Sequence, residues 1–280
     1  MQQKQPSHFR SMTRVLVILA ALLVFAGWSL NTPAGVMSKA NAIGYAVCHR
    51  IDDRSFHVSE RQSPLCARCT GMFLGSMLGI IYQAVAGRRR CGVPPRRVLL
   101  PLILMFLAFA VDGGNSYLSL IKELIPGSLE NIPSLYSPNN TLRLFTGTGI
   151  GLGIAAALFP AFNQTVWADI DERPALTGLR SFGLLVALAI GLDLLLLTQN
   201  PLILYPLVLI SSLSVVALLT MVYSVAWILL TRQENSFSKL TEMWLPLAAG
   251  LTIAMIQIAA IDWVRFWLTG TWGAFLFNLT

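Results

Sequence analysis

The sequence predicts an all-α fold, a polytopic transmembrane helix bundle with about seven spans and a cytoplasmic N-terminus. Hydrophobic residues make up 55% of the 280 residues and charged residues only 12%, a composition well outside that of soluble globular domains. About seven apolar stretches approach or exceed the roughly 20 residues that a helix needs to cross a bilayer. Basic residues cluster between these stretches, as topology determinants do. The net charge of +7 therefore reflects membrane topology and does not indicate nucleic-acid binding.

The predicted spans divide the chain into three parts. They cover residues 15–30, 65–86, 98–111, 142–162, 182–198, 202–230 and 244–268. Residues 1–41 form an N-terminal tail and the first span, residues 42–160 a core with spans two to four, and residues 161–280 a three-span extension. The first span also fits a signal peptide, with Ala40-Asn41-Ala42 as an A-x-A cleavage site. The lipid bilayer is the expected partner, and the oligomeric state stays open.

The positive-inside rule orients these spans. The densest basic cluster lies between Arg88 and Arg97 and directly precedes a span. Placing this cluster in the cytoplasm places the polar segment after the first span on the extracytoplasmic side. That segment also carries basic residues, namely Lys39, Arg50, Arg54, Arg61 and Arg68. We expect a multi-pass protein of the cell membrane whose polar segment faces outward.

The outward segment contains Cys48-His49 and, further on, the CxxC motif Cys66-Ala67-Arg68-Cys69. Three thiols and an imidazole in one place permit metal binding, thiol redox chemistry or a structural bridge. Ser63-Pro64 resembles an N-cap followed by proline at the first helical position, which predicts a helix that starts at the cysteines. Its dipole would lower the pKa of Cys66. Cys91 is expected across the membrane from the other three cysteines.

A second set of polar residues is expected at the same face. Ser137-Pro138-Asn139-Asn140 repeats the serine-proline pattern at the start of the fourth span. Glycines recur at small-xxx-small spacing on the second and fourth spans, which predicts their close approach: Gly71, Gly75, Gly79, Gly147, Gly149, Gly151 and Gly153. Ionisable residues near membrane spans usually pair or line a cavity. Here they are Arg50, Arg54, Arg61, Arg143 and Asp112, and more loosely Asp193, Asp262 and Arg265.

These motifs resemble a known prokaryotic family. The resemblance rests on Cys48-His49-Arg50, Arg54-Ser55-Phe56, residues 64–71 (PLCARCTG), Asp112-Gly113, Ser137, Asn139-Asn140, Arg143 and Thr146-Gly147. In this order they resemble the DUF2085 family of polytopic membrane proteins of unknown function, over about residues 42–154. The resemblance implies a membrane fold and no particular activity, so function must be inferred from the site.

Three interpretations of the site follow. The first is a Zn or Cu centre with Cys48, His49, Cys66 and Cys69 as candidate ligands, because Cys₃His is a standard tetrahedral zinc set. Neighbouring side chains seldom both face one ion, so an incomplete shell with an open position is an alternative within this interpretation. A small anionic substrate would then be held by Arg50, Arg54, Arg68, Asn139 and Asn140. Asp112 and Arg143 are the candidate catalytic residues.

The second interpretation is a membrane thiol-disulfide oxidoreductase in which Cys66 and Cys69 form the active pair and Cys48 resolves or relays. The third is a structural cysteine staple that holds the outer loop of a transporter or binding protein. The sequence alone leaves open which of the three holds, and with it whether the protein is an enzyme.

Overall fold

The computed structural model describes residues 7–129 and 131–273. Over these residues the chain forms eight α-helices, and seven regions are helical, long and apolar enough to cross a membrane. The helices are α1 (Ser7–Asn31), α2 (Val36–Val47), α3 (Ala67–Ala86), α4 (Arg96–Leu124), α5 (Asn140–Val166), α6 (Leu179–Leu197), α7 (Pro201–Leu230) and α8 (Trp244–Thr269). Two 3-10 turns, η1 (Asp52–Arg54) and η2 (Leu240–Met243), complete the helical segments. The predicted all-α polytopic bundle is confirmed.

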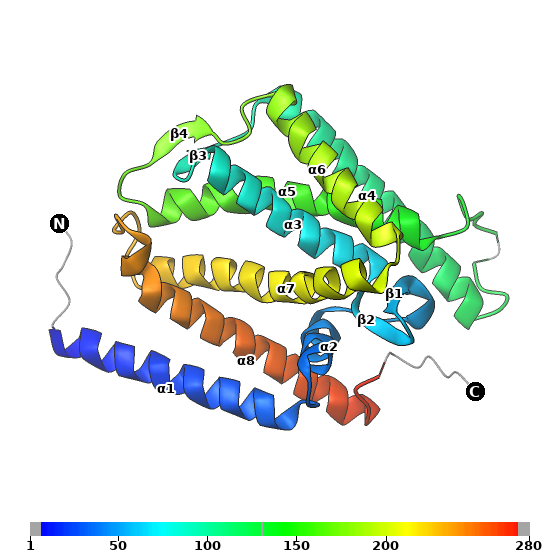
Figure 1. Cartoon of the computed structure of the whole chain (residues 1–280), viewed down its shortest axis with the longest axis horizontal. Coiled ribbons are helices and arrows are strands. Elements are labelled where there is room, and N and C mark those ends of the chain that lie inside the picture. Colours follow the sequence, from blue (N-terminus) through cyan, green and yellow to red (C-terminus); the bar gives the residue numbers. More distant parts are fainter. Residues whose placement is uncertain (1–6, 130, 274–280) are drawn as a thin grey trace.

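The long helices lie side by side across the molecule (Figure 1). Helix α1 packs on α8, α8 on α7, α7 on α3, and α3 on α5, with α4 and α6 at the far edge. Many apolar side chains on the outside of these helices are more than half exposed, among them Leu22, Leu23, Leu100, Leu184 and Leu202. Such an apolar surface suits contact with lipid hydrocarbon.

Short strands mark the two ends of the bundle. Strands β1 (Ser55–Val58) and β2 (Arg61–Cys66) pair antiparallel directly before α3. Strands β3 (Arg90–Gly92) and β4 (Asp171–Pro174) pair in parallel, after the ends of α3 and α5. We call the end that carries β1, β2 and α2 the hairpin end; it lies on the right of Figure 1.

The hairpin end differs from the sequence prediction in how its helices begin. Pro64 belongs to β2, and α3 starts at Ala67 with Cys66 as its N-cap residue in an extended conformation. The predicted Ser63 cap is therefore wrong, because the hairpin pairing of Ser55 with Cys66 extends the strand through the proline. The short helix α2 was also not predicted. It folds the polar segment back against the hairpin, and α2 contacts β2.

Helix α4 is much longer than its predicted span of 98–111. It runs for 29 residues, about 43 Å at 1.5 Å per residue. The prediction ended early because Asp112 and the glycines after it interrupt the apolar run. Asp112 and Asn115 are nevertheless buried, and their hydrogen bonds to other segments allow the helix to continue past them.

Helices α3 and α5 approach each other as the glycine spacing predicted. A Cβ atom on Gly147 would lie 2.1 Å from the carbonyl oxygen of Arg68, and one on Gly71 would lie 2.4 Å from that of Leu144. Glycine is needed at both positions, since no real Cβ atom fits at such distances. Gly153 differs, because a Cβ atom there would meet nothing within 4 Å. The contact therefore fixes the start of α3 against the start of α5.

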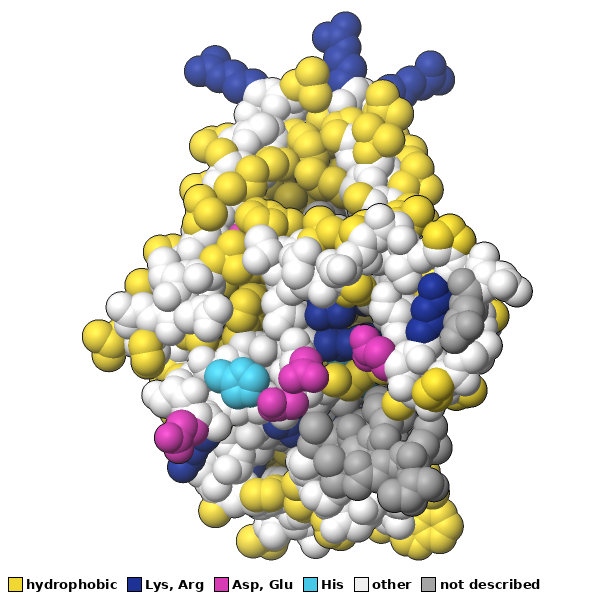
Figure 2. Space-filling view, turned by 90° about the vertical axis from the view of Figure 1, so that its right-hand side faces the viewer, with side chains coloured by type: hydrophobic (Ala, Val, Ile, Leu, Met, Phe, Trp, Pro, Cys, Tyr) yellow, Lys and Arg dark blue, Asp and Glu magenta, His cyan; other side chains and the backbone are white. Residues whose placement is uncertain are grey.

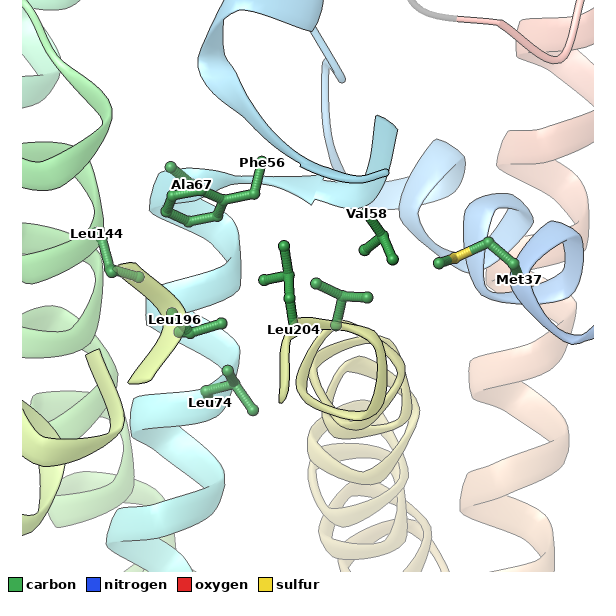
Figure 3. Packing of buried hydrophobic residues seen from close by; sticks show 9 residues of the cluster. Met37, Phe56, Val58, Ala67, Leu74, Leu144, Leu196 and Leu204 are labelled. Carbon is green, nitrogen blue, oxygen red and sulfur yellow. The ribbon is translucent and has the colours of Figure 1, made fainter. Parts of the chain in front are cut away.

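An apolar cluster lies beneath the hairpin. It joins Phe56 and Val58 of β1 to residues of the long helices (Figure 3). Its other buried members are Met37, Ala67, Leu74, Leu144, Leu196, Leu204 and Val208. Burial of this cluster seats the hairpin on the ends of α3, α5, α6 and α7.

Candidate functional site

Three cysteines meet at the hairpin end, and we call them the thiol triad. Cys48 is the C-cap residue of α2, Cys66 ends β2, and Cys69 lies in the first turn of α3. Their Sγ atoms all lie within 4.8 Å of one another, and no disulfide joins them. Cys48 and Cys66 are buried and Cys69 is partly buried. The structure thus brings together three of the four predicted metal ligands.

His49, the fourth predicted ligand, does not join this group. Its Nδ1 lies 3.8 Å from Cys48 Sγ, and the backbone N–H of Ile51 points at the same nitrogen from 3.5 Å. Among the described residues, Cys48, Cys66 and Cys69 form the only group of three or more His, Cys, Asp or Glu side chains whose potential ligand atoms all lie within 4.8 Å of one another. His49 is adjacent to Cys48 in sequence and stands beside the triad, as expected for neighbouring side chains that cannot both face one ion.

Close packing of α2 on β2 positions Cys48. A Cβ atom on Gly44 would lie 1.9 Å from the carbonyl oxygen of Pro64, so the two backbones touch. The sulfur of Cys48 accepts hydrogen bonds from the backbone N–H groups of Cys66, at 3.3 Å, and Arg50, at 3.5 Å. The left-handed backbone of Arg50, with φ of 51°, turns the chain sharply after the cysteine.

The electrostatics of the triad favour a thiolate on Cys48. Hydrogen bonds from the thiols of Cys66 and Cys69, with a smaller contribution from His49, hold the pKa of Cys48 well below its usual value although burial opposes the shift. The interaction with Cys48 raises the pKa of Cys66 to about 12. The predicted lowering of the Cys66 pKa by the helix dipole is therefore wrong. The opposite directions of these pKa shifts favour one thiolate in the triad, on Cys48.

Arg265 of α8 holds the cysteine from the other side. Its Nη1 donates to the carbonyl oxygens of Tyr45 and Cys48, the latter at 2.7 Å, and Nη2 lies 3.4 Å from that of His49. Its guanidinium also stacks on the Tyr45 ring at 3.8 Å. These carbonyls lie at the C-terminal end of α2, where a cation is favourable. The sequence showed Arg265 only as a charge near the end of the last span.

Asp112, a predicted catalytic residue, is the centre of a hydrogen-bond network. Its carboxylate accepts from Arg68 (Nε at 3.1 Å, and Nη2), from Thr146 Oγ1 at 3.1 Å and from Tyr136 OH at 2.9 Å. Burial and the bond to Asp112 raise the pKa of Tyr136 to about 12. Arg68 also donates to Ser116 Oγ at 2.9 Å. A carboxylate with this many donors suits a positioning role better than that of a general base.

Three arginines face this region and one lies apart. Arg68 is engaged by Asp112. Arg54 is buried and reaches the carbonyl oxygen of Ser116 at 3.4 Å. Arg143 is buried, donates to Asn140 Oδ1 at 2.9 Å, and its Nε has no hydrogen-bond partner. Arg50 instead points towards the C-terminal segment, with Nη1 3.3 Å from the carbonyl oxygen of Trp272. The predicted anion-binding arginines therefore fall on two sides of the triad.

The two predicted asparagines have identifiable structural roles. Asn139 is the N-cap of α5, and its side chain accepts from the backbone N–H of Leu142 at 2.8 Å. The predicted start of this helix at Ser137-Pro138 is thus two residues early. Asn140 donates to the carbonyl oxygen of Asp53 at 3.0 Å. This bond joins the start of α5 to η1, so both asparagines help to assemble the hairpin end.

Acidic side chains, a histidine and basic side chains lie close together on the face that the hairpin end presents (Figure 2). His57 Nε2 pairs with Asp52 Oδ1 at 3.0 Å. A pocket of about 310 Å³ opens beside this pair. It is lined by Asp52, Asp53, Ser55, Phe56, His57, Asn140, Thr141, Leu197 and Gln199.

The fold and site define a polytopic membrane protein with a buried cysteine cluster at one end of its helix bundle. The chain belongs to the DUF2085 family of predicted membrane proteins, whose sequence model matches residues 48–157. It is 30% identical over 109 residues to an uncharacterised protein of Methanothermobacter thermautotrophicus, which covers 39% of this chain and 81% of the relative. It is 24% identical over 152 residues to an uncharacterised protein of Methanocaldococcus jannaschii, covering 54% and 86%. No solved structure matches significantly.

The predicted resemblance is therefore confirmed. The matched region begins at Cys48 and contains every residue that the sequence analysis proposed as a metal ligand, a substrate-binding residue or a catalytic residue. Helices α6, α7 and α8 lie outside it. Through Arg265, α8 nevertheless contacts the thiol triad's first member, so the last helix completes a site that the matched region contributes.

Proposed function

We propose that this membrane protein binds a thiophilic metal ion, Zn²⁺ or Cu⁺, on the thiol triad. The observation that supports it is the convergence of three Sγ atoms within 4.8 Å. Two sulfurs bonded to one zinc ion at about 2.3 Å lie about 3.8 Å apart in tetrahedral geometry. The thiols therefore need to move by about 1 Å or less to close around an ion, a shift that side-chain rotation accommodates.

The surroundings of the triad support an anionic metal centre. Three thiolates give a net charge of −1 with Zn²⁺ and −2 with Cu⁺. Arg50 and Arg265 lie beside Cys48, while Arg54 and Arg143 lie towards Cys66. These cations offset the negative charge of the thiolates in a site of low polarity. Three soft ligands also suit Cu⁺, while zinc would keep a fourth position open for water or substrate.

A small anionic ligand fits that open position. Arg54 and Arg143 are buried and have few hydrogen-bond acceptors within the protein. Arginine pairs well with oxyanions through its planar set of donors. In this scheme Arg143 binds the anionic ligand directly. Asp112 does not contact the ligand, and its role is to hold the Arg68 side chain in position.

The second candidate is thiol-disulfide exchange, favoured by the low pKa of Cys48. A thiolate adjacent to two thiols can attack a disulfide and be resolved by a neighbour. This candidate requires one pair of the triad to cycle between thiols and a disulfide. It predicts reducible bridges and no stoichiometric metal.

Metal content and thiol state, measured together on the detergent-purified protein, test both. We expect one zinc or copper ion per chain, lost in Cys66→Ser and retained in Cys91→Ser. A reducible bridge within the triad without metal would support the redox candidate instead. Free thiols that alkylate readily without prior reduction, in a protein that holds no metal, would contradict both. A Cys66→Ser variant that fails to accumulate would indicate the structural staple.

We further propose that the hairpin end faces away from the cytoplasm. Cys91 in β3 lies at the opposite end of α3 from the triad, so one reagent can test the orientation. In a variant whose only cysteine is Cys91, a membrane-impermeant maleimide should label opened cells and not intact ones. Glu60→Cys in a cysteine-free background is the matched control at the exposed hairpin turn, and it should label in intact cells. The reverse pattern would invert the orientation.

A further inference from the structure

A second buried polar site lies inside the bundle, away from the thiol triad. Asp193 of α6 is 1% exposed, and its Oδ1 accepts a hydrogen bond from Thr148 Oγ1 of α5 at 2.8 Å. Its other oxygen, Oδ2, is buried and has no hydrogen-bond partner. No basic residue in the described parts of the chain forms an ion pair with it.

Charged groups on the helices that pack around this pair have partners elsewhere. Arg143, five residues before Thr148 on α5, donates to Asn140 Oδ1. Arg68 of α3 and Asp112 of α4 bind each other, and Asp112 also accepts from Thr146. Thr146 and Thr148 are two residues apart on α5 and so lie on different faces of that helix. Helix α3 presents Gly71 and Gly75 to Thr148, and leucines of α6 and α7 belong to the neighbouring apolar cluster.

An ionised carboxylate in such surroundings is strongly disfavoured, because nothing compensates its charge in a medium of low polarity. The neutral acid fits the observed contacts: Oδ1 accepts from Thr148 and Oδ2 carries the proton. Asp262 of α8 is a second buried carboxyl with one unpartnered oxygen, Oδ1. It differs from Asp193 in its surroundings, because its Oδ2 accepts from Trp28 Nε1 at 3.0 Å and Arg265 follows it by one helical turn.

The spacing of residues along α5 and α6 relates the buried Asp193 to the pocket at the hairpin end. Leu197 follows Asp193 by one turn of α6, and Thr141 precedes Thr148 by two turns of α5, so each pair shares a helix face. Leu197 and Thr141 both line the 310 Å³ pocket at the hairpin end, together with the titratable residues Asp52, Asp53 and His57. The pocket thus lies one to two helical turns from Asp193, towards the hairpin end.

An apolar layer separates the two. Leu144 and Leu196 are fully buried and pack with Phe56, which also lines the pocket. In Figure 3 Leu144 and Leu196 lie between Phe56, at the hairpin, and Leu74, further along α3. Thin apolar layers of this kind can exclude water from a buried polar site and act as a gate for its entry.

We infer that Asp193 and Thr148 form a membrane-embedded proton-binding site that is loaded from the pocket at the hairpin end. This site does not require a metal at the thiol triad. The alternative of a fixed interhelical hydrogen bond predicts a carboxyl that never exchanges its proton. The alternative of a sodium site predicts competition by that ion.

The test uses the full-length protein in lipid vesicles and two readouts. The hydrophobic reagent dicyclohexylcarbodiimide modifies protonated carboxyls inside membranes, and mass spectrometry locates the adduct. We expect modification at Asp193, its loss in Asp193→Asn, and its persistence in Asp262→Asn. Infrared difference spectra between wild type and Asp193→Asn should show the carbonyl band of a protonated acid, which disappears as the pH is raised and shifts in heavy water.

Asparagine preserves the acceptor for Thr148, so Asp193→Asn should fold, which its thermal stability will check. A third variant, Leu196→Ala, thins the apolar layer and should accelerate labelling of Asp193 without changing the band position. A band that neither titrates nor shifts would reduce Asp193 to a structural contact. Protection from the carbodiimide by sodium at constant pH would replace the proton with that ion, and a carboxylate band at neutral pH would overturn the inference outright.

Discussion

The guanidinium of Arg265, in the last helix, donates a hydrogen bond to the carbonyl oxygen of Cys48, with Nη1 and the oxygen 2.7 Å apart. The two residues are 217 positions apart in the chain. Arg265 also contacts the carbonyl oxygens of Tyr45 and His49, so these three contacts hold the C-terminal end of α2 against α8. The position of the first cysteine of the triad therefore depends on a helix outside the region that the family model matches.

Replacing Arg265 should weaken the metal binding that we propose for the thiol triad. Arg265→Lys keeps the positive charge but cannot span three carbonyl oxygens or stack on Tyr45 as a planar group. Groups that orient a ligand typically change metal affinity by about tenfold to a hundredfold, and we expect a loss in that range. Competition with a chromophoric chelator measures it. Arg180→Lys, at an exposed position on α6, is the control, and equal affinities for both variants would contradict this role of Arg265.

His49 should be dispensable for the proposed binding of a metal ion by the thiol triad. Its ring lies outside the group of converging ligand atoms, although it adjoins Cys48. We expect His49→Ala to retain a stoichiometric ion and Cys48→Ser to lose it, as determined by elemental analysis of purified protein. A folded His49→Ala protein without metal would restore the four-ligand set that the sequence predicted.

The contact between α3 and α5 should tolerate no side chain at Gly147. A Cβ atom there would lie 2.1 Å from the Arg68 carbonyl oxygen, so the helices must separate. Overpacking of this kind usually costs about 1–3 kcal/mol, and we expect a lower midpoint of thermal unfolding in detergent. Gly153→Ala, on the same helix with nothing within 4 Å of the new atom, should leave the midpoint unchanged. Equal shifts in the two variants would refute the tight contact.

Asp112 should matter for stability because it neutralises Arg68. Asp112→Asn leaves that guanidinium without its counter-charge, and removing one member of a buried pair costs about 3 kcal/mol or more. Because the Arg68 side chain is 18% exposed, we expect a loss of stability at the lower end of this range. Asp169→Asn is the comparison, since that carboxylate is 89% exposed and lies 3.4 Å from Arg89; such surface pairs contribute about 0–1 kcal/mol. Chemical denaturation of both variants provides the measurement, and a stable Asp112→Asn protein would argue against the network.

Membrane spans were predictable because the bilayer imposes a local rule. A segment that crosses hydrocarbon must satisfy its own backbone hydrogen bonds and present apolar side chains over a fixed length. Hydropathy therefore located all seven spans, although it ended α4 early at Asp112. The glycine spacing on α3 and α5 was equally readable, since residues four apart share a helix face.

The secondary structure of residues at the hairpin end was harder to predict. Ser63-Pro64 matches a helix start, but pairing between Ser55 and Cys66 makes the same residues a strand. A proline at N1 and a proline in an edge strand look alike in sequence. The choice depends on a partner strand, and local pattern carries no information about that partner.

Hydropathy and residue spacing were enough to identify a helical membrane protein with three cysteines and a histidine in one polar segment. The convergence of the cysteines without His49, the binding of Asp112 by Arg68 and the contact of Arg265 with Cys48 became apparent only from the packed helices. Composition and residue spacing indicate whether one segment can form a helix that crosses the bilayer. Contacts between segments depend on distances across the bundle, and those are set by packing of all the helices together.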